Sequence, residues 1–415
     1  MPDNDRDILP AGDEALFPSG QYRNPASSVC RASRHLIKMP KLCGPIACPF
    51  RIALTGLVFA FVAGCAAPTQ SGQQVAVASK TASFVELTSV DGGPYELSYL
   101  ASLPEAETNA PKLVCRHRTL PSGQRSAISA WVWRSSELVE NPARLSGFLD
   151  QARQHGITTL YVQWHADLSQ FDALLREANT RDIAVKLVAG EPSDVLDPRP
   201  LLRVADSINA YNAAHALRFT GLQLDVEPYL LPEYRKDKSA TLARYVELLK
   251  KIRAATVNRY EFSVAIPFWF ADQSLNGKDL MSAVMPEIDR IAVMGYRTRL
   301  DEQLDIDNNA LCHGELYGKP VDLGLEVTKL PREDHYIIET SKLNGFVRSS
   351  DGKTLLHYDP REFDRIATRH WTVEPSRLSY YPDIDAAFAA TRAPIPYTAF
   401  AGWSINGLDD AWLQH

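Results

Sequence analysis

The chain has 415 residues, of which 45% are hydrophobic and 23% charged, as is ordinary for a globular protein. This length suits one large barrel with extra segments, or two ordinary domains. The formal net charge is -6 and there is no acidic tail, so neither the basic excess of a nucleic-acid-binding protein nor an acidic interaction tail is present. The charge identifies no protein partner.

An apolar run at residues 52–64 follows Lys38, Lys41 and Arg51 and ends at Cys65. It is shorter than the roughly 20 residues of a membrane span, and its small residues before the cysteine are typical of a secretory signal. The segment resembles a bacterial lipoprotein signal, which implies that Cys65 receives lipid and becomes the first mature residue. An uncleaved membrane anchor is the alternative.

This resemblance predicts a leader over residues 1–64, and a leader of normal proportions would begin at Met39. Ala66, directly after the cysteine, implies sorting to an outer membrane. We therefore expect a lipid-anchored protein of the bacterial cell envelope, at the periplasmic face or the cell surface. Processing would leave Cys115 and Cys312, whose spacing fits no zinc motif. A disulfide between them and two buried free thiols both remain open.

Residues 65–82 hold the lipidated cysteine and a flexible tether of small and polar residues. Residues 83–125 are predicted to form a small N-terminal extension, with two short strands around the turn Asp91-Gly92-Gly93. Residues 126–415 are predicted to form the main domain.

In the main domain, strand-like apolar runs alternate with amphipathic helical runs, as in parallel βα units. We predict eight strands and six helices. The strands are 128–133, 158–164, 183–188, 221–226, 262–268, 290–296, 321–327 and 400–405, and the helices are 142–154, 170–181, 198–216, 240–257, 278–288 and 360–370.

The predicted fold class is α/β, a (β/α)8 TIM barrel, because eight parallel strands close into a barrel and most of these runs are apolar throughout. A doubly wound open sheet is the alternative, but no glycine-rich phosphate loop supports it. In such a barrel the active site lies at the C-terminal ends of the strands.

The fourth predicted strand ends in two acids, Asp225 and Glu227. Alternate side chains of a strand point to the same face, so both carboxylates are expected to point the same way, with Gln223 below them. Two acids at the end of an apolar strand are costly unless they are paired or used, and proximity separates their pKa values. The structural alternative is a helix cap and an ion pair.

Aromatic and polar residues gather at the other predicted strand ends. Tryptophan offers a flat apolar face and one N–H donor, which suits stacking on a sugar ring, although such residues can also be core. Together with the acids they favour a carbohydrate cleft and a carbohydrate substrate. The candidate substrate-binding residues are Trp133, Trp164, His165, Trp269, Arg297, Trp403 and Asn406.

The passages GLQLDVEP, AVMGYR and GWSING resemble the fourth, sixth and eighth strand motifs of the chitinase-like glycoside hydrolases of family eighteen. The resemblance implies that Glu227 is the general acid, that Asp225 orients the N-acetyl group of the substrate as internal nucleophile, and that Tyr296 binds its oxygen. Trp403 matches the tryptophan beneath the sugar. Thr220 and Gln223 stand where the family has two further acids.

A second resemblance is to the large clan of retaining glycosidases, in which the acid/base glutamate ends strand four and a nucleophilic glutamate ends strand seven. Glu227-Pro228 and Glu326 occupy these positions, although Val226 replaces the usual asparagine. The role of Glu326 therefore distinguishes the two mechanisms: it is the nucleophile in the second, whereas the N-acetyl group of the substrate is the nucleophile in the first.

The leading hypothesis is a lipid-anchored glycoside hydrolase without a cofactor, in which desolvation and the Asp225 charge raise the pKa of Glu227. A catalytically inactive barrel that binds carbohydrate is the second hypothesis, supported by Thr220 and Gln223. Metal-dependent hydrolysis through Asp225, Glu227 and His165 is the third. The ten histidines form no HExxH-type pair, so no metal site is predicted.

Overall fold

The computed structural model describes residues 84–93, 95–100, 112–117, 126–342, 347–348, 354–356 and 360–413. The predicted leader, Cys65 and the tether lie outside these ranges. Within them, none of the helices is both long and apolar enough to pass through a bilayer.

Eight parallel strands close into a barrel, which confirms the predicted (β/α)8 fold. Each predicted strand is present, with ends that differ by one or two residues. In chain order they are β3 (Ala127–Val132), β4 (Ile157–Gln163), β5 (Ala184–Ala189), β6 (Gly221–Leu224), β7 (Glu261–Pro267), β10 (Arg290–Met294), β11 (Val321–Glu326) and β16 (Phe400–Asn406).

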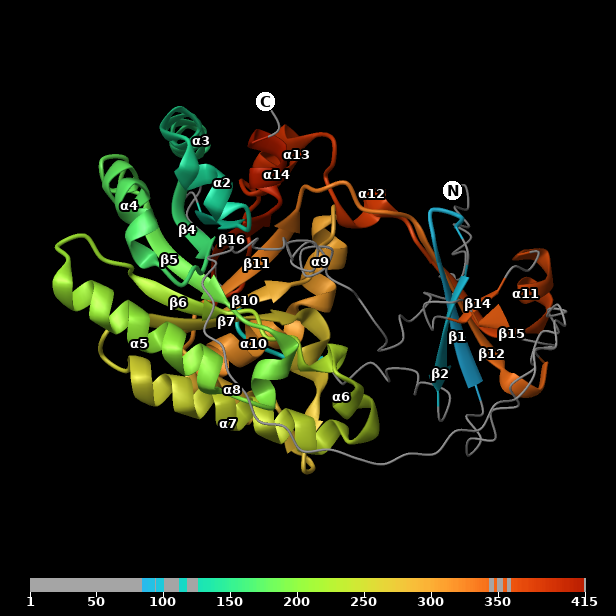
Figure 1. Ribbon diagram of the computed structural model, residues 1–415. Helices are drawn as coiled ribbons and strands as arrows, with labels where there is room; N and C mark the ends of the chain where they lie inside the picture. The colour runs from blue at the N-terminus through green and yellow to red at the C-terminus, as the bar shows by residue number, and fades with distance from the viewer. Residues whose placement is uncertain are drawn as a thin grey trace, which may run out of the picture.

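Helices surround the barrel and pack on the apolar outer faces of its strands (Figure 1). The longer ones are α3 (Pro142–Gln154), α4 (Asp172–Asn179), α5 (Arg199–Ala214), α7 (Lys238–Thr256) and α10 (Asn308–Tyr317), with α13 (Ile384–Ala390) and α14 (Leu408–Trp412) near the C-terminus. Side-chain oxygens cap three of them: Asn141 accepts from the first turn of α3, Asp237 accepts from Ala240 N at the start of α7, and Asp383 accepts from Ala386 N at the start of α13.

Two predicted helices are wrong in part. Residues 278–279 form β9 (Lys278–Asp279), which pairs with β8 (Ser274–Leu275) through a turn in which Asn276 and Gly277 have φ of 53° and 74°. This Asn-Gly pair is a hairpin signal that favours a strand over a helix. Only α8 (Met281–Val284) and a short 3-10 turn follow it.

The second error lies at residues 367–370. The helix α11 (Pro360–Ile366) ends at Ile366, and the chain continues as β15 (Ala367–Val373). These residues form a strand because they pair antiparallel with β12 (Glu333–Glu339). Long-range pairing of this kind overrides local helix propensity, since the ladder satisfies the backbone donors and acceptors.

Beyond the barrel, the chain builds a second, antiparallel sheet in the order β13-β14-β2-β1-β12-β15. The predicted hairpin at Asp91-Gly92 is confirmed as β1 (Phe84–Val90) and β2 (Tyr95–Leu100), which pair antiparallel. β1 also pairs with β12, and β13 (Val347–Arg348) and β14 (Thr354–Leu356) complete the order. The sheet thus joins the N-terminal hairpin to a segment inserted between the last two barrel strands.

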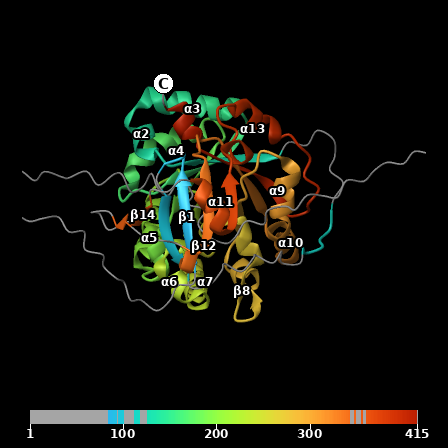
Figure 2. The same ribbon diagram turned by 90° about the vertical axis from the view of Figure 1, so that its right-hand side faces the viewer.

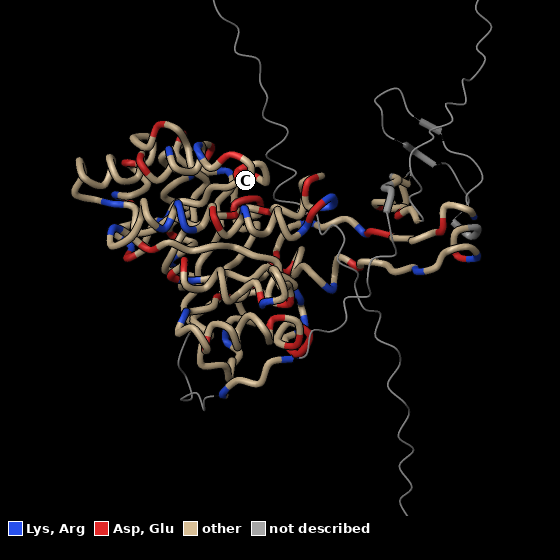
Figure 3. The backbone as a smooth tube through the Cα atoms, turned by 90° about the horizontal axis from the view of Figure 1, so that it is seen from below, with Lys and Arg blue, Asp and Glu red and all other residues tan. Residues whose placement is uncertain are grey.

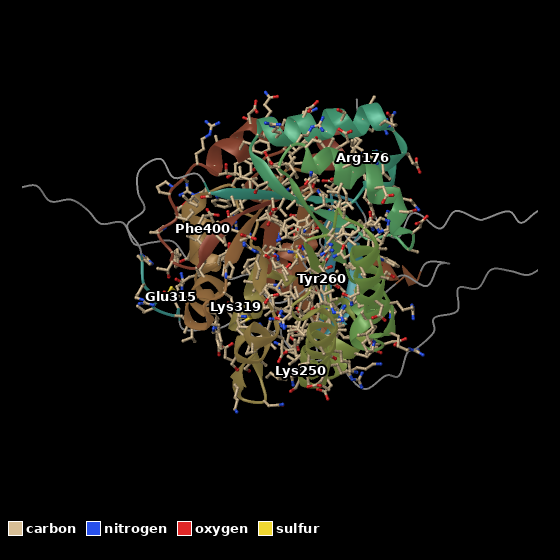
Figure 4. The ribbon with its side chains drawn as sticks, turned by 90° about the vertical axis from the view of Figure 1, so that its left-hand side faces the viewer. Arg176, Lys250, Tyr260, Glu315, Lys319 and Phe400 are labelled. Atoms are coloured by element: carbon tan, nitrogen blue, oxygen red, sulfur yellow. A yellow bond between two sulfur atoms is a disulfide. The ribbon has the colours of Figure 1, made fainter. Side chains whose placement is uncertain are left out.

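This second sheet stands beyond one end of the barrel (Figures 1 and 2). Figure 4 looks onto the opposite end and labels Tyr260, Lys319 and Phe400, which lie at or just before the starts of β7, β11 and β16. The sheet therefore faces the C-terminal ends of the barrel strands, where barrel active sites lie.

A disulfide joins Cys115 to Cys312 of α10, with the Cα atoms 5.2 Å apart. The structure thereby decides between the two alternatives that the sequence left open for these cysteines. The same segment is held by Leu113 N, which donates to Asn309 Oδ1 at 2.8 Å, and by an ion pair between Arg116 and Glu315. Residues 112–117 are therefore fixed to the side of the barrel.

Candidate active site

A pocket of about 690 Å³, counting space open to solvent, lies at the C-terminal ends of the barrel strands. Glu227 and Glu326 both line it, so the acidic ends of the fourth and seventh strands meet at one mouth. Most of the other lining residues are apolar or aromatic. They are Tyr229, Pro267, Phe268, Trp269, Met294, Tyr296, Arg297, Leu330, Pro331, Glu333, Val373 and Leu378.

Glu227 lies three residues beyond β6 and is 3% exposed. The hydroxyl of Tyr229 donates a hydrogen bond to its Oε1. The Tyr229 ring packs edge-on against Trp269, with centroids 5.0 Å apart. Burial and the Glu227 charge raise the pKa of Tyr229, so this residue is a permanent donor at neutral pH. Tyr229 was not predicted as a site residue from the sequence.

Glu326 is the last residue of β11 and is fully buried. Its Oε1 accepts from the backbone N and the Oγ1 of Thr328, both at 2.7 Å, and its Oε2 accepts from Asn406 Nδ2 at 2.7 Å. Burial raises the pKa of Glu326, while these three donors act in the opposite direction. The donors therefore orient the side chain and stabilise its ionised form in an otherwise apolar place.

Asn406 connects this acid to the first barrel strand. Its Oδ1 accepts from Trp133 Nε1 at 2.7 Å. Gly407, the next residue, has φ of 89°, and a Cβ there would lie 2.2 Å from Thr328 Cγ2. Glycine is therefore required where the end of β16 passes the Glu326 site. Of the predicted binding residues, Trp133 and Asn406 thus act on the pocket through Glu326, since neither lines it directly.

Of the candidate site residues, Tyr296, Arg297 and Trp269 line the pocket. Arg297 is 2% exposed, its Nη1 donates to Tyr296 O at 2.7 Å, and its guanidinium lies 5.5 Å from the centre of the Phe268 ring. This stacking leaves the arginine in a fixed position on an aromatic wall.

Asp225 is absent from the lining of the pocket, contrary to the expectation that it points with Glu227. Its backbone N donates to Ala189 O at 3.0 Å, and a Cβ on Gly190 would lie 2.5 Å from Asp225 O. Burial, and then the charge of Glu191, raise the pKa of Asp225 to about 7. The acid that acts on Asp225 is therefore Glu191, at the end of the third strand.

Trp403 is a correction to the predicted site. It is 1% exposed and packs on Phe400 in the core between barrel and helices, so it does not lie beneath the pocket. Successive residues of a strand face opposite sides, and on β16 Asn406 takes the side of the pocket. The motif placed Trp403 on the correct strand, but the register turns it outward.

Trp164 and His165 also lie outside the pocket lining. Trp164 packs against the outer core. His165 Nε2 lies 3.0 Å from Ser135 Oγ and 2.9 Å from Ser136 Oγ, and burial lowers its pKa. Both serines lie at the start of a short helix, so the His165 imidazole connects the end of its strand to that helix.

No group of three or more His, Cys, Asp or Glu side chains within the described ranges is arranged to hold a metal ion. Lys and Arg are interspersed with Asp and Glu along the described backbone (Figure 3). The pocket itself combines three glutamates with one arginine.

No family model and no curated protein matches this sequence. Among solved structures, the chain is similar to the Bacillus cereus spore cortex-lytic enzyme SleL, with 10% identity and a TM-score of 0.36 over 69% of this chain and 72% of that chain. It is similar to a class V chitinase from Pseudomonas fluorescens Pf-5, with 13% identity and a TM-score of 0.36 over 68% and 94%.

A further similar structure is a family 18 N-acetylglucosaminidase from Paenibacillus barengoltzii, with 16% identity and a TM-score of 0.34 over 68% of this chain and 94% of that chain. The last of these structures is described as a member of glycoside hydrolase family 18, the family whose strand motifs this sequence resembles. The fold assignment rests on the closed barrel itself.

Replacement of Asp225 by Asn should change how stability depends on pH. A carboxyl whose pKa is raised from 3.8 to about 7 by folding binds its proton more tightly in the folded state. Its contribution therefore destabilises the wild type as pH rises from about 4 to about 7, by at most about 1.4 kcal/mol per pH unit. We expect the Asp225→Asn variant to lack this decline and to exceed the wild type in stability at pH 8, as measured by urea unfolding from pH 5 to 8. Parallel curves for the two proteins would contradict the assignment.

Proposed function

We propose that this protein is a glycoside hydrolase in which Glu227 is the general acid. One observation supports this most directly: Glu227 and Glu326, from strands four and seven, line the same aromatic-walled pocket. A pair of carboxyl groups flanking one bond is the usual apparatus of glycoside hydrolysis. Glu227 is buried at the pocket, where water does not compete for its proton, and Tyr229 can stabilise the carboxylate that remains after proton transfer.

The pocket walls suit a sugar. Trp269 and Phe268 present apolar rings for the C–H face of a pyranose, while Tyr296 and Arg297 supply polar groups for its hydroxyls. By the resemblance to family eighteen, Tyr296 would bind the N-acetyl oxygen of an amino sugar. The proposed substrate is therefore a polysaccharide or glycan.

For the nucleophile we favour Glu326 over the N-acetyl group of the substrate. Asp225, which would orient that group, is absent from the pocket lining, whereas Glu326 is present and held by three donors. In the first step, Glu227 protonates the glycosidic oxygen while the Glu326 carboxylate bonds to the anomeric carbon and the leaving group departs. In the second, Glu227 removes a proton from water, which attacks the same carbon and releases Glu326.

The Glu227→Gln variant should lose glycan hydrolysis by at least about 100-fold, because the amide cannot transfer the proton and general acid–base catalysis contributes about 10²–10⁴-fold. Reducing-end release from a panel of glycans measures this loss. Glu247→Gln, an exposed change on α7, is the matched control and should keep full activity. Undiminished hydrolysis in a folded Glu227→Gln protein would reject the assignment.

The Glu326→Ala variant distinguishes the two nucleophiles. If Glu326 forms the glycosyl–enzyme bond, the variant should lose at least about 100-fold in activity, and azide should restore turnover with release of a glycosyl azide. If the N-acetyl group is the nucleophile instead, the variant should retain hydrolysis of N-acetylated substrates without azide. That second result would contradict the proposed role of Glu326.

A sugar-binding protein without turnover is the second candidate. It is favoured by Gln223, which stands where family eighteen has an acid and whose Oε1 accepts from Trp131 Nε1 at 2.6 Å inside the barrel. Glycan-array binding without product release, in both the wild type and Glu227→Gln, would select this candidate over the enzyme.

We further propose that the protein is anchored by lipid on Cys65 in the bacterial envelope, with its barrel outside the cytoplasm. The Cys115–Cys312 disulfide supports this location, because disulfides persist in oxidising compartments such as the periplasm.

The lipid anchor can be tested by labelling cells with radioactive palmitate. The wild type should carry the label and sediment with membranes, whereas Cys65→Ser should carry none, because the thiol that accepts the lipid is gone. Cys48→Ser, which changes a leader cysteine that processing would remove, should behave as the wild type. Labelling of Cys65→Ser at the wild-type level would contradict the anchor.

A further inference from the structure

The pocket continues onto the second sheet. Glu333 of β12 and Val373 of β15 are cross-strand partners, and both line the pocket. Because alternate residues of a strand share a face, the next pair on that face is His335 with Trp371. Two residues along a strand advance about 7 Å, so Trp371 lies just outside the rim of the pocket.

The Trp371 ring is held flat against His335. The two rings are stacked with centroids 4.8 Å apart and an interplanar angle of 5°. His335 lies on the β12 side, and β15 is the edge of the described sheet. The opposite face of the Trp371 ring therefore turns away from the sheet, and the residue is only half-buried.

His335 is itself fixed from both sides. It is 3% exposed, with Nε2 3.0 Å from Glu333 Oε2 and Nδ1 3.3 Å from Glu86 Oε1. Burial lowers the pKa of His335, but the hydrogen bonds and charges of Glu333 and Glu86 outweigh it and raise the pKa to about 9. A charged imidazole under an indole ring adds a cation–π attraction. Glu86 belongs to β1, so the N-terminal hairpin takes part in holding the ring.

From this geometry we propose that Trp371 forms a sugar-stacking subsite outside the pocket. The substrate is then a linear glycan that runs from Glu227 past Glu333 and along β12 and β15. The open indole face would take a pyranose with a flat C–H face. Because Glu86 and Glu333 lie next to the platform, a neutral chain fits it better than a polyanionic one. The inference rests on the proposed function for the position of the scissile bond.

The test measures binding without turnover. In the full-length Glu227→Gln protein, calorimetry compares the dimer and the hexamer of two neutral series, chito- and cello-oligosaccharides, with and without Trp371→Ala. The hexamer can span the pocket and the platform, whereas the dimer fits the pocket alone. In the series that binds, we expect Trp371→Ala to weaken hexamer binding by about 3- to 10-fold and to leave dimer binding unchanged, as the loss of one aromatic contact predicts.

Trp412→Ala is the matched control, because Trp412 is also half-buried but lies on α14 away from the pocket lining. It should change neither affinity. Equal loss for dimer and hexamer would indicate a general disturbance of the pocket and would overturn the subsite, as would unchanged hexamer binding in Trp371→Ala or no hexamer binding in either series. None of these results bears on Glu227, whose role depends on the loss of hydrolysis.

Discussion

The site depends on the burial of two carboxyl groups at the mouth of an apolar barrel. A buried carboxylate is costly unless hydrogen bonds replace its water, and each glutamate receives its own donors. Tyr229 donates a hydrogen bond to Glu227, and Thr328 and Asn406 donate hydrogen bonds to Glu326. The two acids therefore have different donors: a phenol hydroxyl donates to Glu227, whereas a backbone amide, a hydroxyl and a side-chain amide donate to Glu326. Different surroundings can give two carboxyl groups in one site different pKa values, which the proposed roles of acid and nucleophile require.

The donors of Glu326 tie distant parts of the chain together. Asn406 comes from the eighth strand and also binds Trp133 from the end of the first. The approach of β16 to Thr328 depends on Gly407, where any side chain would collide. The geometry of one acid thus requires the closure of the whole barrel, since the first and eighth strands are neighbours only when the sheet is closed.

The second sheet extends this arrangement away from the barrel. β12 and β15 lie between the seventh and eighth barrel strands in the chain, and β12 pairs with β1 of the N-terminal hairpin in the same sheet. The ion pairs from Glu86 through His335 to Glu333 run from β1 to the rim of the pocket. The segment that follows the predicted tether is therefore part of the structure that borders the site.

Local patterns were sufficient to predict much of the protein. Apolar runs bounded by turns indicated all eight barrel strands, and the Asp91-Gly92 turn indicated the first hairpin. The order of strands then implied that Glu227 and Glu326 lie at the same end. Because parallel strands place their carboxyl ends together, these conclusions need only strand order and direction. The register of the strands and the pairing of distant strands depend on segments far apart in the chain, so local patterns do not predict them.

Only the tertiary structure decided which side of its strand each residue occupies and what it contacts. Trp403 faces the outer core, and the charge of Glu191 acts on Asp225. Tyr229 and Asn406 each donate a hydrogen bond to one of the two pocket acids. Residues 367–373 are a strand because β12 is there to pair with them, which no local pattern contains. The sequence alone determined the fold and the end of the barrel that holds the site, since both follow from local hydrophobic periods, whereas the contacts within the site depend on segments far apart in the chain.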